Sequence, residues 1–197
     1  MQFDTVSDHA RLVALQAVID RWLAELGERM DVVAPAVTAW SPLKHVAHVA
    51  LANELVLRNI KSLVSGQGAL VVQGGEPVKG ALRLLETGLI ERGRAQSPRM
   101  VRPPEAVDRA LLREWLDDGR HELQALDPLV IRAGDLKVPH QLLGPLDAPQ
   151  WVRFGVVHTR HHLAIAGEAL AAQGADPAAL ALPAITGPTE RAGRCSS

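Results

Sequence analysis

Two histidines in one apolar segment give the clearest chemical signal in this chain. His158 and His162 lie four residues apart within the stretch 151–170. Because four residues make about one helical turn, a helix here places both imidazoles on the same face, one above the other. Two imidazoles in that relation can bind one divalent metal ion. No glutamate follows His158, so the pair is not the HExxH motif of zinc proteases.

A third ligand for such an ion must come from another helix. His48 is the best candidate, because it lies in an apolar segment that follows the Trp-Ser-Pro run at 40–42. His45, one turn earlier on a similar face, remains an alternative ligand. His161 lies off the face of the pair, and we expect it to orient a partner or to contact a neighbouring helix.

Other residues have plain structural interpretations. A single histidine on an apolar helix is usually a core residue that hydrogen-bonds to a neighbour, so the metal hypothesis depends on the pair. His140 lies in a loop before the ligand helix, where we expect a surface residue, with the mouth of the site as the alternative. Arg153 and Arg160 carry the charge to bind an anionic substrate, yet charged helix residues more often face solvent.

Helical periodicity predicts the elements that position these histidines. Ser41 is a good N-cap with Pro42 at the first helical position, and Asp147 begins the helix that carries His158 and His162. Strand signals are scarce, so the sequence predicts an all-α four-helix bundle with long irregular crossover loops. We expect helices over residues 4–27, 41–64, 105–126 and 147–173, a short helix over 80–94, and connections over 65–80, 97–104 and 127–149.

Composition agrees with a helical fold and excludes several functions. Hydrophobic residues make up 47% of the 197 residues, yet there is no Tyr and only two Phe, so the core must be built from Leu, Val and Ala. That balance favours packed helices over sheet. We expect one domain over residues 1–174 and a weakly packed C-terminal tail over 175–197. A net charge of −1 with dispersed basic residues speaks against nucleic acid, and no P-loop or GxGxxG motif supports nucleotide binding.

Cysteine usage and hydropathy indicate the compartment. Cys195 is the only cysteine, which excludes a disulfide framework and a cysteine-based zinc site. The N-terminus lacks a basic region followed by an apolar run, and no stretch of about 18 apolar residues occurs. We therefore expect a cytoplasmic protein with no membrane partner.

The spacing of Trp40, His48 and the C-terminal pair resembles that of the DinB-like (YfiT-like) family. In that family a Trp-Ser pair precedes the second helix, and the first ligand histidine follows the Trp by eight residues. An HxxxH pair on the last long helix supplies the other two ligands. Trp40 plus eight is His48, so the resemblance, which covers about residues 4–172, implies His48, His158 and His162 as metal ligands.

The same resemblance implies a four-helix bundle, a homodimer and a zinc or nickel ion. Characterised members include transferases and isomerases that use low-molecular-weight thiols. The resemblance thus implies a small-molecule substrate and an enzyme that activates a thiol, as an S-transferase, or water, as a hydrolase. Members often carry a glutamine three residues after the last ligand. Ile165 stands there in this chain, so any role of that amide does not carry over.

Three imidazoles suit an activating role but do not select the metal. They are neutral, so the charge of a divalent ion stays uncancelled, which acidifies bound water and favours a bound thiol as thiolate. Zinc, nickel, copper and iron all accept imidazole. The residues name no acid or base beyond the metal. Two other interpretations stay open, a non-catalytic bundle that binds metal or a small ligand, and a metal-free interaction protein with core histidines.

Overall fold

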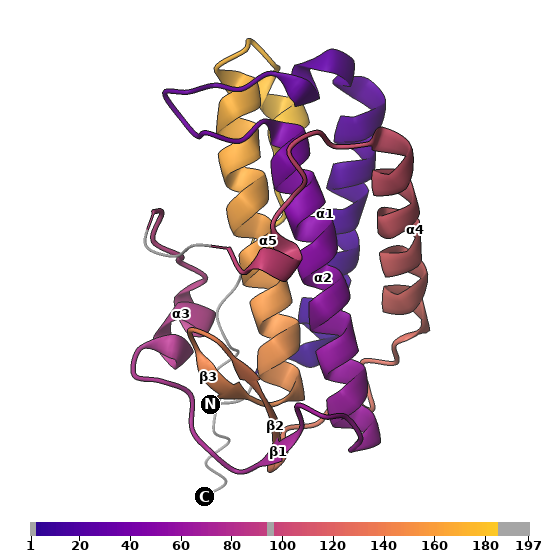
Figure 1. Cartoon of the computed structure of the whole chain (residues 1–197), viewed down its shortest axis with the longest axis vertical. Coiled ribbons are helices and arrows are strands. Elements are labelled where there is room, and N and C mark those ends of the chain that lie inside the picture. The colour runs from indigo at the N-terminus through magenta and orange to yellow at the C-terminus, as the bar shows by residue number, and fades with distance from the viewer. Residues whose placement is uncertain (1–2, 94–96, 185–197) are drawn as a thin grey trace, which may run out of the picture.

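Helices dominate the structure, which is a computed structural model describing residues 3–93 and 97–184. Within these ranges the chain forms five α-helices and one small sheet of three short strands (Figure 1). No helix in the described ranges combines the length and apolarity needed to cross a membrane. The elements are α1 (Thr5–Glu25), α2 (Pro42–Ser65), β1 (Val72–Gln73), α3 (Ala81–Thr87), α4 (Arg109–Ala125), β2 (Leu136–His140), β3 (Gly144–Leu146) and α5 (Ala148–Ala171), with short 3-10 helices η1 (Gly27–Asp31), η2 (Arg99–Val101) and η3 (Pro177–Leu180).

The four longest helices pack side by side (Figure 1). Helix α2 contacts α5 and α4, and α1 contacts the same two helices from the opposite side. α1 and α2 therefore lie diagonally across the group. The closest partners are α2 and α5, which are the two helices predicted to carry the metal ligands.

Capping residues fix the start of both histidine-bearing helices. Ser41 accepts a hydrogen bond from the backbone of Lys44 and Pro42 follows it, as the sequence predicts. At α5, Asp147 and Gln150 form a reciprocal capping box, in which each side chain bonds the backbone of the other. These caps set which residues of α2 and α5 face each other.

The core lies between the helices and consists mainly of aliphatic side chains. α5 lies close to its neighbours at Gly155, where an added Cβ would lie 3.2 Å from Val56 Cγ1 on α2 and 3.4 Å from Leu12 Cδ1 on α1. A larger residue there would push α5 away from α2. The fully buried side chains include Leu15, Ile19, Trp22, Leu43, Ile60, Leu112 and Leu163.

The sheet corrects the expectation of an all-α fold. β1 pairs antiparallel with β2, and β2 pairs antiparallel with β3, with His140 opposite Gly144. The turn requires glycine at 144, because its φ is +76° and a Cβ would lie only 3.1 Å from the backbone nitrogen of Val78. The β2–β3 hairpin runs directly into the cap of α5, so it is attached to the start of the ligand helix.

The residues after α5 return to the helices. Ala175 is buried, the indole of Trp22 donates to the carbonyl of Ala179 (3.0 Å), and Arg160 donates to the carbonyl of Pro183 (3.1 Å). The described part of the predicted tail, residues 175–184, therefore packs against α1 and α5. Residues 185–197, which include Cys195, lie outside the described residues, and the domain boundary at 174 stays a prediction.

Candidate metal centre

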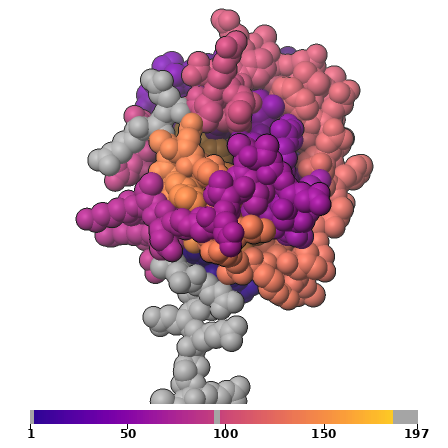
Figure 2. Space-filling view, turned by 60° about the horizontal axis from the view of Figure 1, so that its bottom comes forward, coloured from indigo at the N-terminus to yellow at the C-terminus, as the bar shows by residue number. Residues whose placement is uncertain are grey.

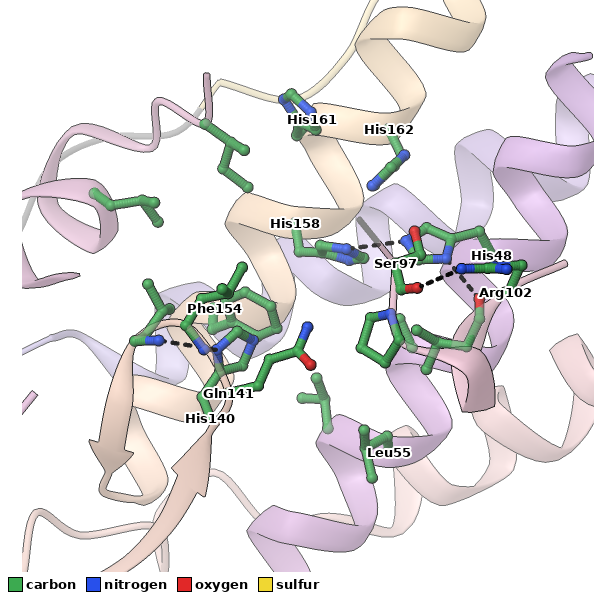
Figure 3. A pocket seen from close by; sticks show the side chains of 18 of the residues that line it. His48, Leu55, Ser97, Arg102, His140, Gln141, Phe154, His158, His161 and His162 are labelled. Atoms are coloured by element: carbon green, nitrogen blue, oxygen red, sulfur yellow. Dashed lines mark hydrogen bonds between the residues drawn. The ribbon is translucent and has the colours of Figure 1, made fainter. Parts of the chain in front are cut away.

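Three histidines from two helices converge on one point. His48 projects from α2, and His158 and His162 project from α5, one turn apart (Figure 3). One ring nitrogen from each lies within 4.8 Å of the other two. The ring centroids of His48 and His162 are 4.4 Å apart, and those of His158 and His162 are 4.6 Å apart. The structure therefore brings together the three residues that the sequence singled out.

The spacing of the ring nitrogens fits a divalent ion. Nε2 of His48 and Nε2 of His158 are 3.2 Å apart. Two nitrogens on one tetrahedral zinc, with bonds of about 2.0–2.1 Å, lie about 3.3 Å from each other. The donor set also fits, because three imidazoles without a carboxylate leave a coordination position open for a substrate or water.

His48 is oriented by a backbone carbonyl. Its Nδ1 lies 2.7 Å from the carbonyl oxygen of Val101 in η2. A carbonyl only accepts, so Nδ1 carries the proton and Nε2 keeps its lone pair for a metal. The segment predicted as a plain linker, 97–104, thus fixes the tautomer of a ligand.

His162 is oriented by a second histidine. Its Nδ1 lies 3.1 Å from Nδ1 of His45, whose Nε2 lies 3.1 Å from the hydroxyl of Thr38. When His162 donates to His45 and His45 donates to Thr38, both rings are neutral and Nε2 of His162 keeps its lone pair. His45 lies outside the group of three nitrogens, so it serves as a partner of a ligand.

His158 differs from a satisfied core histidine. Its Nδ1 is buried and has no hydrogen-bond partner among the described residues. Buried polar atoms in native proteins are nearly always bonded, so packing alone does not account for this ring. Its Nε2, in contrast, lies 3.2 Å from Nε2 of His48, on the side where an ion would bind.

Burial keeps these imidazoles uncharged. It lowers the pKa of His48, of His158 and of His162 below the ordinary value of 6.5, and the neighbouring histidines lower those of His158 and His162 further. Burial also lowers the pKa of His45 to about 4. Neutral rings offer lone pairs to a metal at neutral pH.

Trp40 packs against two histidines of the triad and against His45. Its ring lies 5.3 Å from His45, 5.4 Å from His48 and 6.3 Å from His162, measured between centroids. The Trp-Ser pair therefore has two roles, since Ser41 starts α2 and Trp40 shields the imidazoles that α2 and α5 present.

A cavity of about 460 Å³ opens beside the triad, which forms part of its wall. Figure 2 shows a hollow at the end of the molecule that holds the hairpin, and Figure 3 shows the triad within the lining. Most lining side chains are apolar, among them Ile165. Glu91 is the one carboxylate among the described lining residues, and Arg92 and Arg102 are the cations.

The expectation for Arg153 is wrong, whereas Arg160 stays partly exposed. Arg153 neither faces solvent nor lines the cavity, because its side chain is 1% exposed and donates to Asp8 (3.0 Å) and to the carbonyl of Leu85 (2.7 Å). Arg160 lies against the segment after α5, where it donates to Pro183. His161, in contrast, lines the cavity beside His162 and stays outside the group of three.

Replacing His45 by phenylalanine is expected to weaken Zn²⁺ binding by about 10–100-fold, because a ring remains beside Trp40 but the acceptor for His162 is lost. Competition with a chromophoric chelator measures the dissociation constant. His161→Phe is the matched control and should change it by less than about threefold. Equal affinities of the His45 variant and the wild type would contradict the role of His45.

The comparisons with known proteins found one relationship. A family model described as the DinB superfamily matches residues 11–166. Neither the curated proteins nor the solved structures gave a match. The matched range spans α1 to α5 and includes all three histidines of the triad.

Proposed function

The chain belongs to the DinB superfamily, and from this premise we propose that it is a metal-dependent enzyme with a zinc or nickel ion on His48, His158 and His162. The observation that supports this most strongly is the convergence of three neutral imidazoles on the wall of a cavity. A structural metal site is normally closed by four protein ligands. This site offers three and faces a space that a small molecule can enter.

The reaction that we favour is transfer of a low-molecular-weight thiol to an electrophilic small molecule. When bound, the ion would lower the pKa of a thiol or a water beside it and so supply a nucleophile at neutral pH. A hydrolase also needs a positioned group that accepts the proton of water. Glu91 is the sole carboxylate among the described lining residues, so thiol transfer fits better and hydrolysis is the second candidate.

The chain's own residues would bind and orient the reactants. His48, held by Val101, and His162, held by His45, keep their lone pairs directed at one point. The apolar walls would exclude water from the electrophile. We also interpret the group of α1, α2, α4 and α5 as a four-helix bundle. The homodimer and the cytoplasmic location stay predictions.

Thiol consumption tests the proposal. The Cys195→Ser protein, prepared without a histidine tag and loaded with one equivalent of Zn²⁺ or Ni²⁺, is incubated with 1-chloro-2,4-dinitrobenzene and glutathione, bacillithiol or mycothiol. We expect at least one thiol to be consumed in a metal-dependent reaction. The activity should be lost in His158→Ala and kept in His121→Ala, which changes an exposed histidine on α4.

The outcomes separate the candidates. Hydrolysis of a p-nitrophenyl ester without thiol consumption would select the hydrolase. Stoichiometric metal with neither activity would leave a non-catalytic metal-binding protein, and no bound metal would remove the proposal.

A further inference from the structure

His140, at the end of β2, is held in one orientation by two backbone groups. Its Nδ1 accepts hydrogen bonds from the backbone N–H groups of Leu142 (3.1 Å) and Leu143 (3.2 Å). Its ring packs edge-on against Phe154, at 4.5 Å between centroids, and lies 5.5 Å from Trp151. Both aromatic residues belong to α5, so the hairpin turn and α5 hold the ring between them.

These contacts determine where the proton of His140 lies. A nitrogen that accepts from two N–H groups cannot itself carry a proton, so Nε2 is the protonated nitrogen of the neutral ring. Burial lowers the pKa of His140 to about 4, which agrees with a neutral ring. No described residue accepts a hydrogen bond from Nε2, and that atom is not among the fully buried unpartnered ones.

The ring that carries this N–H lines the same cavity as the metal triad. His140 and His158 both line that cavity, and Phe154 lies between them, 4.5 Å from one ring and 5.2 Å from the other (Figure 3). The cavity is lined mostly by apolar side chains, among them Leu55, Leu142 and Ile165, with Gln141 as a polar neighbour of His140. A donor fixed in apolar surroundings gains most from an acceptor on a ligand, because the unbonded alternative is unfavourable.

We propose that the cavity binds a largely apolar substrate that carries a carbonyl oxygen, and that Nε2–H of His140 donates a hydrogen bond to this oxygen. The neutral ring suits a neutral acceptor, since a carboxylate at this position would be buried without a countercharge from His140. The reacting atom then lies a few bonds away, beside the triad. Only this last point rests on the proposed function; the hydrogen bond does not.

Two ligands of the same shape test the hydrogen bond. Acetophenone carries a carbonyl where α-methylstyrene carries a methylene group, and binding of each is measured by NMR titration of the metal-free and the zinc-loaded protein. In His140→Asn, the side-chain oxygen can still accept from the turn, as asparagine does in Asx-turns, but no donor reaches the position of Nε2.

We expect the ratio of the two affinities to shift by about 2–12-fold against acetophenone in His140→Asn, which corresponds to one neutral hydrogen bond. Long-range ¹H–¹⁵N spectra of the wild type should show a protonated Nε2 and an unprotonated Nδ1. The control, His121→Ala, changes an exposed histidine on α4 that does not line the cavity and should leave the ratio unchanged.

An unchanged ratio of the two affinities in His140→Asn would overturn the proposal, even if both affinities fall by the same factor. A protonated Nδ1 in the wild type would overturn it too. Failure of both ligands to bind the wild-type protein would overturn it as well. Because the titrations use neither thiol nor turnover, a missing transferase activity does not affect these results. A positive transferase assay does not by itself support the role of His140.

Discussion

Replacing His158 by alanine is expected to weaken Zn²⁺ binding by on the order of a hundredfold or more. Zinc sites of protein ligands contribute about 10 kcal/mol or more in total, so one of three ligands accounts for about 3 kcal/mol. Competition titrations of tag-free protein measure the change. The structure adds a second expectation, that the metal-free variant stays folded, because the only polar contact that the His158 ring loses is that of Nε2 with His48, and Nδ1 has no partner among the described residues.

The exposed His121 provides the control for this change. His121→Ala should bind zinc as tightly as the wild type. Without metal, His121→Ala and the wild type should show the same melting temperature. A His158 variant with wild-type affinity would contradict the triad, and an unfolded metal-free variant would show that the ring is needed for packing instead.

Replacing Asp8 by alanine is expected to destabilise the protein by about 3–5 kcal/mol. Asp8 and Arg153 pair at 3.0 Å with side chains 2% and 1% exposed, so the change leaves a guanidinium buried without its carboxylate. Arg153 also donates to the carbonyls of Leu85 and Glu86 at the end of α3. The loss of Asp8 therefore loosens the contact between α3 and α5, beside the cavity.

Urea unfolding at pH 7 measures this effect. Asp20→Ala is the control, because Asp20 pairs with Arg120 where both side chains are more than a third exposed, at 39% and 34%. Exposed pairs contribute about 0–1 kcal/mol, so the control should change little. Similar losses of unfolding free energy in the two variants would contradict a special stabilising role of the buried Asp8–Arg153 pair.

The sequence was sufficient to predict the four long helices and the triad, whereas the short helix predicted over 80–94 ends at Thr87. Their signals are local: Ser41 and Asp147 are caps at the expected positions, and the four-residue spacing of His158 and His162 fixes their common face. His48 required the family resemblance, because apolar periodicity alone does not distinguish it from His45. In the structure, the close packing of α2 on α5 brings His48, and not His45, into the group with His158 and His162.

Residues that depend on contacts between distant segments were not predictable. The strands are short, and β2 and β3 contain Pro139 and Pro145, so they lack the alternating pattern that marks a strand. The burial of Arg153 depends on Asp8, 145 residues earlier in the chain. The carbonyl of Val101 that orients His48 carries no side-chain signal at all.

The orientation of His140 belongs to the same class. Its tautomer is set by two N–H groups in a turn, and its exposure to the cavity is set by Phe154 and Trp151 on the following helix. The expectation of a surface loop residue was wrong because the loop contains a hairpin. A glycine at 144 between two short apolar runs was the available turn signal.

Anomalous diffraction from crystals grown with Zn²⁺ tests the central claim most directly. We predict one strong peak at the zinc edge, within about 2.0–2.1 Å of a ring nitrogen of His48, His158 and His162 and open toward the cavity on its remaining side. A fully occupied zinc ion elsewhere in the molecule, or a triad without a peak at saturating zinc, would contradict it.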